Sequence, residues 1–346
     1  MSNRLNWGVL STARINQRFL HAAGASPRSH VAAVASRSDE VAVRYARDNA
    51  IPAAYGSYQR LLADPSIDAV YISLPNALHA DWAVAAAQAG KHVYCEKPLA
   101  TSAADVDRIA AAAAAAGVVV SEACAMSYHS QTALIASLVQ NGDLGDVRLI
   151  RGWFGFTLPS AVDPRLEPAL AGGSLWDIGC YPIGLTRAVL RQTPIDAAGS
   201  GRIGPTGVDL SSFGQVRYDG GAVLQVATSM DAPGSWSFEV IGSRGVLAVS
   251  EPYLTQIGAT SEVTLRAASV PGGGTFGDEP LPPPTVVARF ERPNAYVDAL
   301  AAFERTVLDG ASPVHTLAES RWNVSVVEAL HRSARLGQTV PVAELS

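Results

Sequence analysis

The triplet Glu96-Lys97-Pro98 ends an apolar, strand-like run at residues 92–95 with a carboxylate and an amine. The proline disfavours helical geometry at Lys97 and therefore restricts the direction of its side chain. In an open α/β sheet, residues that follow the carboxyl end of a strand face the ligand. The position of Lys97 is therefore typical of a ligand-binding lysine, and a lysine in a solvated turn is the plainer alternative.

A second stretch with reactive residue types is 172–183, which contains Asp177 and Tyr181. If this stretch is helical, the two side chains are four residues apart and share a face. Pro182 and the glycines argue against a long regular helix, so the shared face is a hypothesis. Taken alone, Tyr181 is equally an ordinary half-buried core aromatic.

A turn of small residues joins an apolar run at 5–10 to a helical stretch at 12–24. Gly8 and Ala13 fit the first and third positions of G-x-G-x-x-G/A, but Leu10 misses the second. Such a turn lets backbone N–H groups approach a pyrophosphate at a helix N-terminus, and a plain strand-to-helix turn is the alternative. The residues predicted to bind cofactor here are Gly8, Ser11, Thr12, Ala13, Arg14 and Ile15.

The next strand ends in Ser36, Arg37 and Ser38. An NAD site usually has an acidic residue here, which binds the ribose hydroxyls. A guanidinium beside hydroxyl groups instead suits a 2′-phosphate, so we expect NADP(H) to be favoured. Asp39 lies close enough to keep NAD(H) possible, and Arg37 as a solvated loop charge is the alternative.

Strand-like runs and helical stretches alternate through residues 1–125, which predicts a doubly wound parallel sheet. From Val147 onward strands dominate and Gly-rich turns join several of them, which predicts an α+β domain over 126–346 built on a large, mostly antiparallel open sheet. A Pro- and Gly-rich surface loop is expected at 270–284. The expected strands are 5–10, 31–36, 68–73, 92–95, 118–121, 147–156, 213–219, 222–230, 235–243 and 245–251, and the expected helices are 12–24, 39–49, 78–89, 102–116, 294–309 and 317–336.

The composition of the 346 residues excludes several protein classes. A net charge of -5 without a basic run argues against nucleic-acid binding. No stretch reaches the ~20 apolar residues that span a bilayer, and the N-terminus lacks the apolar core of a signal peptide. Cys95, Cys124 and Cys180 have neither metal-ligand nor disulfide-framework spacing. We therefore expect a cytoplasmic protein without a metal site.

Seven stretches resemble the Gfo/Idh/MocA family of nicotinamide-dependent oxidoreductases, and together they run over nearly the whole chain. They are GVLSTARI, AVASRS, ISLPNALHA, YCEKPL, SEACAMSYHSQ, LGDVRLIRG and GGSLWDIGCYPIG. The form DIGCYPI resembles the branch with dimeric dihydrodiol dehydrogenases, NADP-dependent xylose dehydrogenases and glucose-fructose oxidoreductase. Ser11 and Ala13 depart from the family, which more often has glycine at both positions.

The resemblance implies a Rossmann nucleotide-binding domain followed by a substrate-binding and oligomerisation domain. It implies that Lys97 contacts the nicotinamide ribose and that Tyr181 is the catalytic acid or base. The Lys97 ammonium would favour the phenolate and lower the pKa of Tyr181. Asp177 would orient Lys97 or a substrate hydroxyl, Glu96 would accept hydrogen bonds from the ribose, and the Lys97–Pro98 bond would be cis.

The same resemblance assigns residues to the cofactor cleft and to the substrate pocket. The loop that would line the cofactor cleft contains Ser73, Leu74, Pro75, Asn76 and His79, with a packing role as the equal alternative for His79. The candidate substrate residues are His129, Phe154 and Arg165. For the aromatic strand that contains Trp153, Phe154 and Phe156, core packing is the alternative.

The resulting hypothesis is an NAD(P)-dependent aldose dehydrogenase or ketosugar reductase, with a sugar or related diol as substrate. One alternative is a relative that uses retained NAD(H) transiently for glycoside cleavage or epimerisation. Another is a non-catalytic dinucleotide-binding sensor. The uncovered face of the second sheet, which includes the apolar strand 222–230, is expected to pair with another copy in a homodimer or homotetramer.

Overall fold

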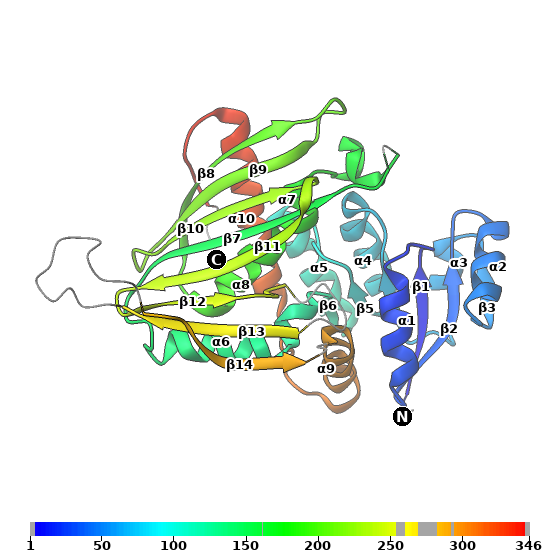
Figure 1. Ribbon diagram of the computed structural model, residues 1–346. Helices are drawn as coiled ribbons and strands as arrows, with labels where there is room; N and C mark the ends of the chain where they lie inside the picture. The colour runs from blue at the N-terminus through cyan, green and yellow to red at the C-terminus, as the bar shows by residue number, and fades with distance from the viewer. Residues whose placement is uncertain (1–3, 161, 254–259, 269–281, 292–293, 343–346) are drawn as a thin grey trace, which may run out of the picture.

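The computed structural model describes residues 4–160, 162–253, 260–268, 282–291 and 294–342. Two sheets dominate this part of the chain, one with six strands and one with nine (Figure 1). The surface loop predicted at 270–284 lies mostly outside the described residues. Within the described ranges, no helix combines the length and the apolar character that a membrane span requires.

The six-stranded sheet is parallel throughout, with the order β3-β2-β1-β4-β5-β6. Its strands are β1 (Leu5–Leu10), β2 (Ser29–Ala35), β3 (Ala53–Tyr55), β4 (Ala69–Ile72), β5 (His92–Cys95) and β6 (Val120–Glu122). The direction of winding reverses between β1 and β4, and the carboxyl ends of strands at such a switch frame a ligand crevice. The doubly wound parallel sheet is therefore confirmed, with β3 as a strand that the sequence patterns did not indicate.

Helices cover both faces of this sheet. One face packs against α3 (Tyr58–Leu62), α4 (His79–Gln88) and α5 (Ala103–Ala116). The other packs against α1 (Asn16–Ala25), α2 (Asp39–Asp48) and α9 (Ala295–Asp309). Phe303 of α9 is buried with its ring 5.3 Å from that of Trp7 on β1. A helix from the end of the chain thus completes the core of the N-terminal sheet, and the domain division at residue 125 stays a prediction.

The nine-stranded sheet has the order β14-β13-β12-β11-β7-β10-β9-β8-β15. Its strands are β7 (Val147–Thr157), β8 (Pro194–Ile203), β9 (Asp209–Tyr218), β10 (Val223–Ser229), β11 (Asp231–Gly242), β12 (Gly245–Val249), β13 (Thr260–Ala267), β14 (Thr285–Glu291) and β15 (Val340–Pro341). Neighbouring strands are antiparallel except β7 and β10, which are parallel. The mostly antiparallel sheet is therefore confirmed, whereas β8, β13, β14 and β15 were not predicted.

Three helices pack on one face of the large sheet, namely α6 (Ser130–Gln140), α8 (Cys180–Leu190) and α10 (Leu317–Leu336). Figure 1 shows the opposite face without covering helices. Along β10, Leu224 and Val226 are buried, whereas Gln225 lies on the opposite side of the strand, because successive side chains of a strand alternate. The open face is therefore less apolar than the sequence of β10 indicated.

Candidate active site

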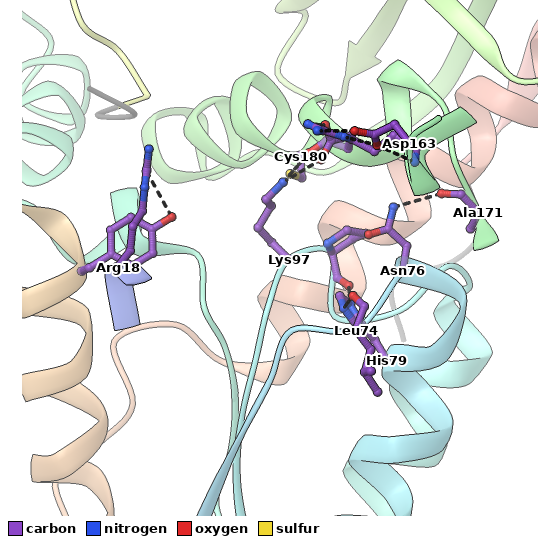
Figure 2. Close-up of polar contacts among 12 residues, drawn as sticks. Arg18, Leu74, Asn76, His79, Lys97, Asp163, Ala171 and Cys180 are labelled. Atoms are coloured by element: carbon purple, nitrogen blue, oxygen red, sulfur yellow. Dashed lines mark hydrogen bonds and ion pairs between the residues drawn. The ribbon is translucent and has the colours of Figure 1, made fainter. Parts of the chain in front are cut away.

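Lys97 lies at the carboxyl edge of the six-stranded sheet, just beyond β5. Figure 2 shows its side chain pointing toward the segment that contains Cys180. Its Nζ donates to the backbone carbonyl of Asp177 at 2.5 Å and lies 3.3 Å from a carboxylate oxygen of the same residue. The Lys97–Pro98 bond is cis, as predicted. The amine is thus held between the sheet that supplies it and the segment that supplies Asp177.

Asp177 and Tyr181 come from two consecutive helices. Asp177 lies on α7 (Ser174–Ile178), and Tyr181 lies in the first turn of α8. Gly179 between them keeps helical dihedral angles, so the direction of the chain is preserved. Both residues contact the Lys97 side chain, Asp177 by hydrogen bonds and Tyr181 through its ring. The hypothesis of a shared helical face therefore agrees with the structure.

Asp209, at the start of β9, positions α7. Its carboxylate accepts hydrogen bonds from the Leu175 N–H and from the Ser174 hydroxyl, both at 2.8 Å. These groups belong to the first turn of α7, whose N–H groups lack partners within the helix. Sequence patterns missed Asp209 because it lies on a distant strand with no motif around it.

Tyr181 presents its ring to the lysine, with Lys97 Nζ 5.0 Å from the ring centroid. Burial raises the pKa of Tyr181 well above its ordinary value, although the Lys97 ammonium acts in the opposite direction. The predicted lowering of this pKa is therefore wrong for the protein without ligands. The physical reason is that desolvation of the phenolate outweighs its attraction to the ammonium.

The Lys97 side chain is a protonated amine. Burial acts to lower the pKa of Lys97, but its anionic neighbours outweigh burial and raise that pKa well above its ordinary value. Among these neighbours, Asp177 places a carboxylate oxygen 3.3 Å from the amine, whereas Tyr181 contributes only when it ionises. Glu96 is buried and accepts a hydrogen bond from the Tyr71 hydroxyl at 2.6 Å. The cleft therefore contains a protonated amine beside a protonated phenol.

The turn between β1 and α1 is built around Ser11, whose φ of 129° lies in the region that favours glycine. Its Oγ lies 2.7 Å from Ser73 Oγ and accepts from the Ala13 N–H at 3.1 Å. Asn16 donates to the Ser11 carbonyl and accepts from the Ser73 hydroxyl. These hydrogen bonds hold the serine in a conformation where glycine is usual, and they bring the predicted turn against the predicted loop that begins at Ser73.

Gly8, which was predicted to bind cofactor, has a packing role in the structure. A Cβ added at Gly8 would lie 2.4 Å from a methyl carbon of Leu61. Since Gly8 is buried inside β1, its lack of a side chain allows α3 to approach the strand closely.

The carboxyl end of β2 carries the residues predicted to select the cofactor. Ser36 is buried, whereas Arg37 and Ser38 are exposed. Ser38 caps α2 with its side chain. Asp39 lies 3.6 Å from Arg60, so the carboxylate that could bind a ribose has a cation beside it. This donor set fits a 2′-phosphate better than two free ribose hydroxyls.

The segment between β7 and α7 contacts both domains. Arg165 forms an ion pair with Asp163 at 2.9 Å and lies 3.5 Å from a carboxylate oxygen of Asp177. Asn76, in the loop after β4, donates to the carbonyl of Ala171 at 3.0 Å (Figure 2). The loop predicted to line the cofactor cleft therefore touches the segment predicted to shape the substrate pocket.

Two predicted histidines have ring nitrogens engaged with the backbone. The two ring nitrogens of His79 lie 2.7 Å from the carbonyl oxygens of Leu74 and Pro98, and the ring is buried. His129 accepts from the Gln131 N–H at 3.1 Å and caps α6. Both residues therefore act on the backbone around them, and His79 ties the loop after β4 to the loop after β5.

The aromatic residues of β7 divide between the two faces of the sheet. Phe154 is buried, and its ring centroid lies 5.3 Å from that of Tyr181. The guanidinium of Arg165 lies 5.4 Å from the Phe156 ring. Trp153 instead lines a hollow on the open face. Phe154 therefore has the core-packing role and also contacts Tyr181, whereas its predicted contact with substrate stays a prediction.

Arg18 and Tyr296 lie beside the cleft and were not predicted. Arg18 Nη1 is 3.4 Å from the Tyr296 hydroxyl, and its guanidinium lies 5.2 Å from that ring. In Figure 2, the Arg18 side chain lies on one side of Lys97 and Asn76 lies on the other. Burial raises the pKa of Tyr296 to about 12. Tyr296 comes from α9, so only the fold brings it near a motif some 200 residues away in the chain.

The residues at the carboxyl edge of the six-stranded sheet fit a bound dinucleotide. The Ser11 turn precedes α1, Arg37 is exposed at the end of β2, and the protonated Lys97 reaches into the cleft. In the described part of the chain, no group of three His, Cys, Asp or Glu residues could hold a metal ion. The Ser11 turn, Arg37 and Lys97 together suit a phosphate-bearing organic cofactor.

Comparisons with known proteins agree with this geometry. Residues 5–124 match the GFO_IDH_MocA oxidoreductase family with an NAD-binding Rossmann fold, and residues 132–248 match the GFO/IDH/MocA C-terminal domain. The chain is 36% identical to D-xylose 1-dehydrogenase (NADP(+)) 2 of Haloferax volcanii, over 96% of this chain and 98% of that protein. It is 30% identical to the 1,5-anhydro-D-fructose reductase of Ensifer adhaerens, over 97% and 98%.

Two solved structures extend the similarity to three dimensions. KijD10, a 3-ketoreductase from Actinomadura kijaniata in complex with NADP and TDP-benzene, has a TM-score of 0.86 at 26% identity, covering 96% of this chain and 98% of that one. An aldose-aldose oxidoreductase from Caulobacter crescentus has a TM-score of 0.83 at 27% identity, covering 98% and 99%. The chain therefore belongs to the Gfo/Idh/MocA family of oxidoreductases with an NAD-binding Rossmann fold.

Proposed function

We propose that this protein is an NADP(H)-dependent oxidoreductase that acts on a hydroxyl or carbonyl carbon of a sugar or related diol. The observation that carries the proposal is the convergence of Lys97, Asp177 and Tyr181 at the carboxyl edge of the nucleotide-binding sheet. The names of its relatives describe the same class of reaction, namely dehydrogenation of xylose, reduction of anhydrofructose and reduction of a keto group.

In this proposal, the bound nicotinamide donates or accepts the hydride, and the protein handles the proton. A tyrosine is protonated at neutral pH, and burial raises the pKa of Tyr181 further, so the phenol is ready to protonate a carbonyl oxygen during reduction. The Lys97 ammonium, aimed by Asp177, stabilises the negative charge that develops on that oxygen. During oxidation the same ammonium favours the phenolate form of Tyr181, which accepts the proton of the alcohol.

The remaining predicted residues receive binding roles. We assign the 2′-phosphate to Arg37 with its flanking serines, and the pyrophosphate to the turn 11–15. Glu96 and Lys97 would hold the nicotinamide ribose. On the substrate side, Arg165 lies beside Asp177, where its guanidinium could bind substrate hydroxyls.

We also propose that the protein forms a homodimer or homotetramer through the open face of the large sheet. This face carries a hollow of about 620 Å³, lined by Trp153 and by the half-exposed Phe213. Exposed aromatic residues in a concave face are typical of protein interfaces. Sedimentation at micromolar concentration tests this assembly, and a monomer there would contradict it.

Three cysteines support a cytoplasmic location within this proposal. Cys95, Cys124 and Cys180 are buried and free. Free thiols persist in a reducing compartment, whereas oxidising compartments favour disulfides.

The test of the enzymatic proposal measures initial rates with NADP⁺, NAD⁺ and their reduced forms. The panel contains aldoses, polyols, ketosugars and dihydrodiols, with Tyr181→Phe and Lys97→Ala beside the wild type. Turnover with an NADP cofactor that is lost in both variants would support the proposal. A cofactor that stays bound without net turnover would favour glycoside cleavage or epimerisation, and binding without chemistry would favour a sensor.

A further inference from the structure

The backbone that follows Lys97 is tied to α10 through one buried carboxylate. Glu122, at the end of β6, accepts from the Leu99 N–H at 3.0 Å through Oε1. Its Oε2 accepts from the Ser320 hydroxyl at 2.7 Å and lies 3.0 Å from His315 Nε2. Leu99, Glu122, His315 and Ser320 are all almost completely buried. The Lys97 segment is therefore connected to the first turn of α10 without access to water.

The same turn of α10 is tied to the helix that carries Tyr181. Arg187 lies on α8 and forms an ion pair with Glu319 in the first turn of α10. Glu319 also closes a capping box with Thr316, which fixes its own position on the helix. The first turn of α10 therefore contacts both structures that supply the catalytic side chains.

Charge strengthens both connections. Burial acts to raise the pKa of Glu122, but His315, Ser320 and the Leu99 N–H outweigh burial, and that pKa lies below its ordinary value. The pKa of Glu319 is also lowered, because Arg187 and the Thr316 N–H outweigh burial. Both carboxylates are therefore ionised at neutral pH, and hydrogen bonds to ionised groups are the stronger ones.

We propose that Glu122 is a positioning residue that, through the first turn of α10, sets the distance between Lys97 and Tyr181. The inference rests on the proposed function, in which these two residues act on one substrate oxygen. Lys97 follows strand β5 of the six-stranded sheet, whereas Tyr181 lies on α8, which packs on the nine-stranded sheet, so their separation depends on the contacts that join these two parts. A displacement of about 1 Å in such a pair can cost on the order of 10²-fold in rate.

A matched pair of variants tests the proposal. Glu122→Gln keeps the shape and an oxygen for the Leu99 N–H, but its amide nitrogen cannot accept hydrogen bonds from α10. Glu304→Gln is the control. Glu304 is as buried as Glu122, lies on α9, and accepts from the hydroxyls of Ser26 and Ser29 at 2.6 Å at the opposite edge of the sheet.

The expected result is a split between stability and catalysis. Both variants lower the midpoint of urea unfolding, whereas only Glu122→Gln lowers kcat, by about tenfold, with substrate KM within threefold of wild type. Glu122→Gln also weakens NADPH binding about fivefold, measured by NADPH fluorescence without turnover. Changes in kcat and NADPH affinity no larger than those of Glu304→Gln would overturn the proposal.

The binding measurement separates this proposal from the function on which it rests. If the wild type binds NADPH but turns over no substrate in the panel, the proposed function fails, and the NADPH affinities still decide the role of Glu122. Should Glu122→Gln fail to fold, Ser320→Ala removes one of its hydrogen bonds and is expected to show the same selective loss at a smaller size.

A double variant tests whether the two connections act through the same turn. Arg187→Met removes the link between α8 and α10 and is expected to lower kcat about fivefold. If both connections act through the first turn of α10, the double variant Arg187→Met with Glu122→Gln has a kcat no more than twofold below that of the less active single variant. Fully multiplicative effects would mean that the two sites act independently, which would overturn the shared anchor.

Discussion

The strand β5 has a lysine near each end, and the two lysines have opposite surroundings. Lys91 precedes the strand, is 7% exposed, and donates to the backbone carbonyls of Asp64 and Ile67 at 2.7 and 2.8 Å. Lys97 follows the strand and donates to Asp177, which belongs to the other domain. Burial lowers the pKa of Lys91, whereas the pKa of Lys97 is raised. The partners of Lys91 are thus carbonyls of its own domain, which gives it a structural role, whereas Lys97 reaches a carbonyl and a carboxylate oxygen of Asp177 in the other domain.

The same difference separates the two edges of the six-stranded sheet. At the amino edge, Ser29 accepts from the Trp7 indole at 2.8 Å and donates to Glu304. These groups satisfy one another and form a closed network. At the carboxyl edge, Lys97 and Arg37 keep charges that face the cleft or solvent. Polar residues at the amino edge therefore stabilise the fold, whereas those at the carboxyl edge leave charges where an open α/β sheet binds its ligand.

The largest expected effect comes from exchanging each lysine for methionine. Lys97→Met should lower kcat by about 10³-fold, on the order of 4 kcal/mol of transition-state stabilisation, because the ammonium beside the reacting oxygen is lost. Lys91→Met should leave kcat within twofold and lower the free energy of unfolding by about 1–3 kcal/mol, since two buried carbonyls lose their donor. Initial rates and urea unfolding measure both. A large loss of kcat in Lys91→Met would contradict the purely structural role of the lysine that precedes β5.

Tyr181→Phe should lower kcat by about 10²-fold, at the lower end of the usual contribution of a general acid or base. Because the pKa of Tyr181 is raised, its acid form persists up to and beyond pH ~10, so the carbonyl-reduction rate should not fall in this range through Tyr181. Alcohol oxidation needs the phenolate, so its rate should rise with pH over the same range. The pH profiles in both directions check this, and an oxidation rate that levels off below pH 8 would contradict it.

Two arginines near the ends of β2 allow the carboxyl and amino edges of the sheet to be compared in the same way. Arg37→Ala should raise KM for NADP⁺ about tenfold and leave KM for NAD⁺ within twofold, because only NADP⁺ carries the 2′-phosphate. Arg28, just before β2, pairs with Asp309 at 2.6 Å. Arg28→Ala should change neither KM. If Arg37→Ala raised KM equally for NADP⁺ and NAD⁺, the 2′-phosphate would have to bind to other residues.

The smallest expected effect concerns Asn76, in the loop after β4. Asn76→Ala removes the hydrogen bond to the Ala171 carbonyl and so frees the segment before α7 from the nucleotide-binding domain. We expect substrate KM to rise about threefold, with kcat nearly unchanged, since one neutral hydrogen bond contributes about 1 kcal/mol. A drop in kcat with unchanged KM would instead assign this contact to the chemical step.

Much of the nucleotide-binding half could be predicted from the sequence, because its signals are local. The apolar run of β5 and the proline at 98 predict where the strand ends, and Lys97 lies there in the structure. Short elements were harder to predict. The strand β3 has three residues and α3 has five, so neither is long enough to show a periodic pattern.

Residues whose roles depend on distant partners could not be predicted. Asp209 of β9 caps α7, and Glu122 of β6 joins the Leu99 N–H to Ser320 of α10. Neither residue belongs to a motif with regular spacing. The pKa of Tyr181 was predicted in the wrong direction for the same reason, because burial by side chains such as Phe154 is a property of the packed molecule.

Sequence patterns alone were enough to predict the class of fold, the positions of the lysine and the tyrosine in the chain, and the polar residues at the end of β2. Hydrophobic periodicity and turn residues encode these features locally. Only the tertiary structure decided which groups meet. It brought Tyr296 of α9 beside Arg18, joined the first turn of α10 to Glu122 and to Arg187 of α8, and buried Tyr181 so that the pKa of its phenol is raised. Contacts between distant segments depend on the packing of whole elements, and the free energy of a charge depends on how much water that packing removes.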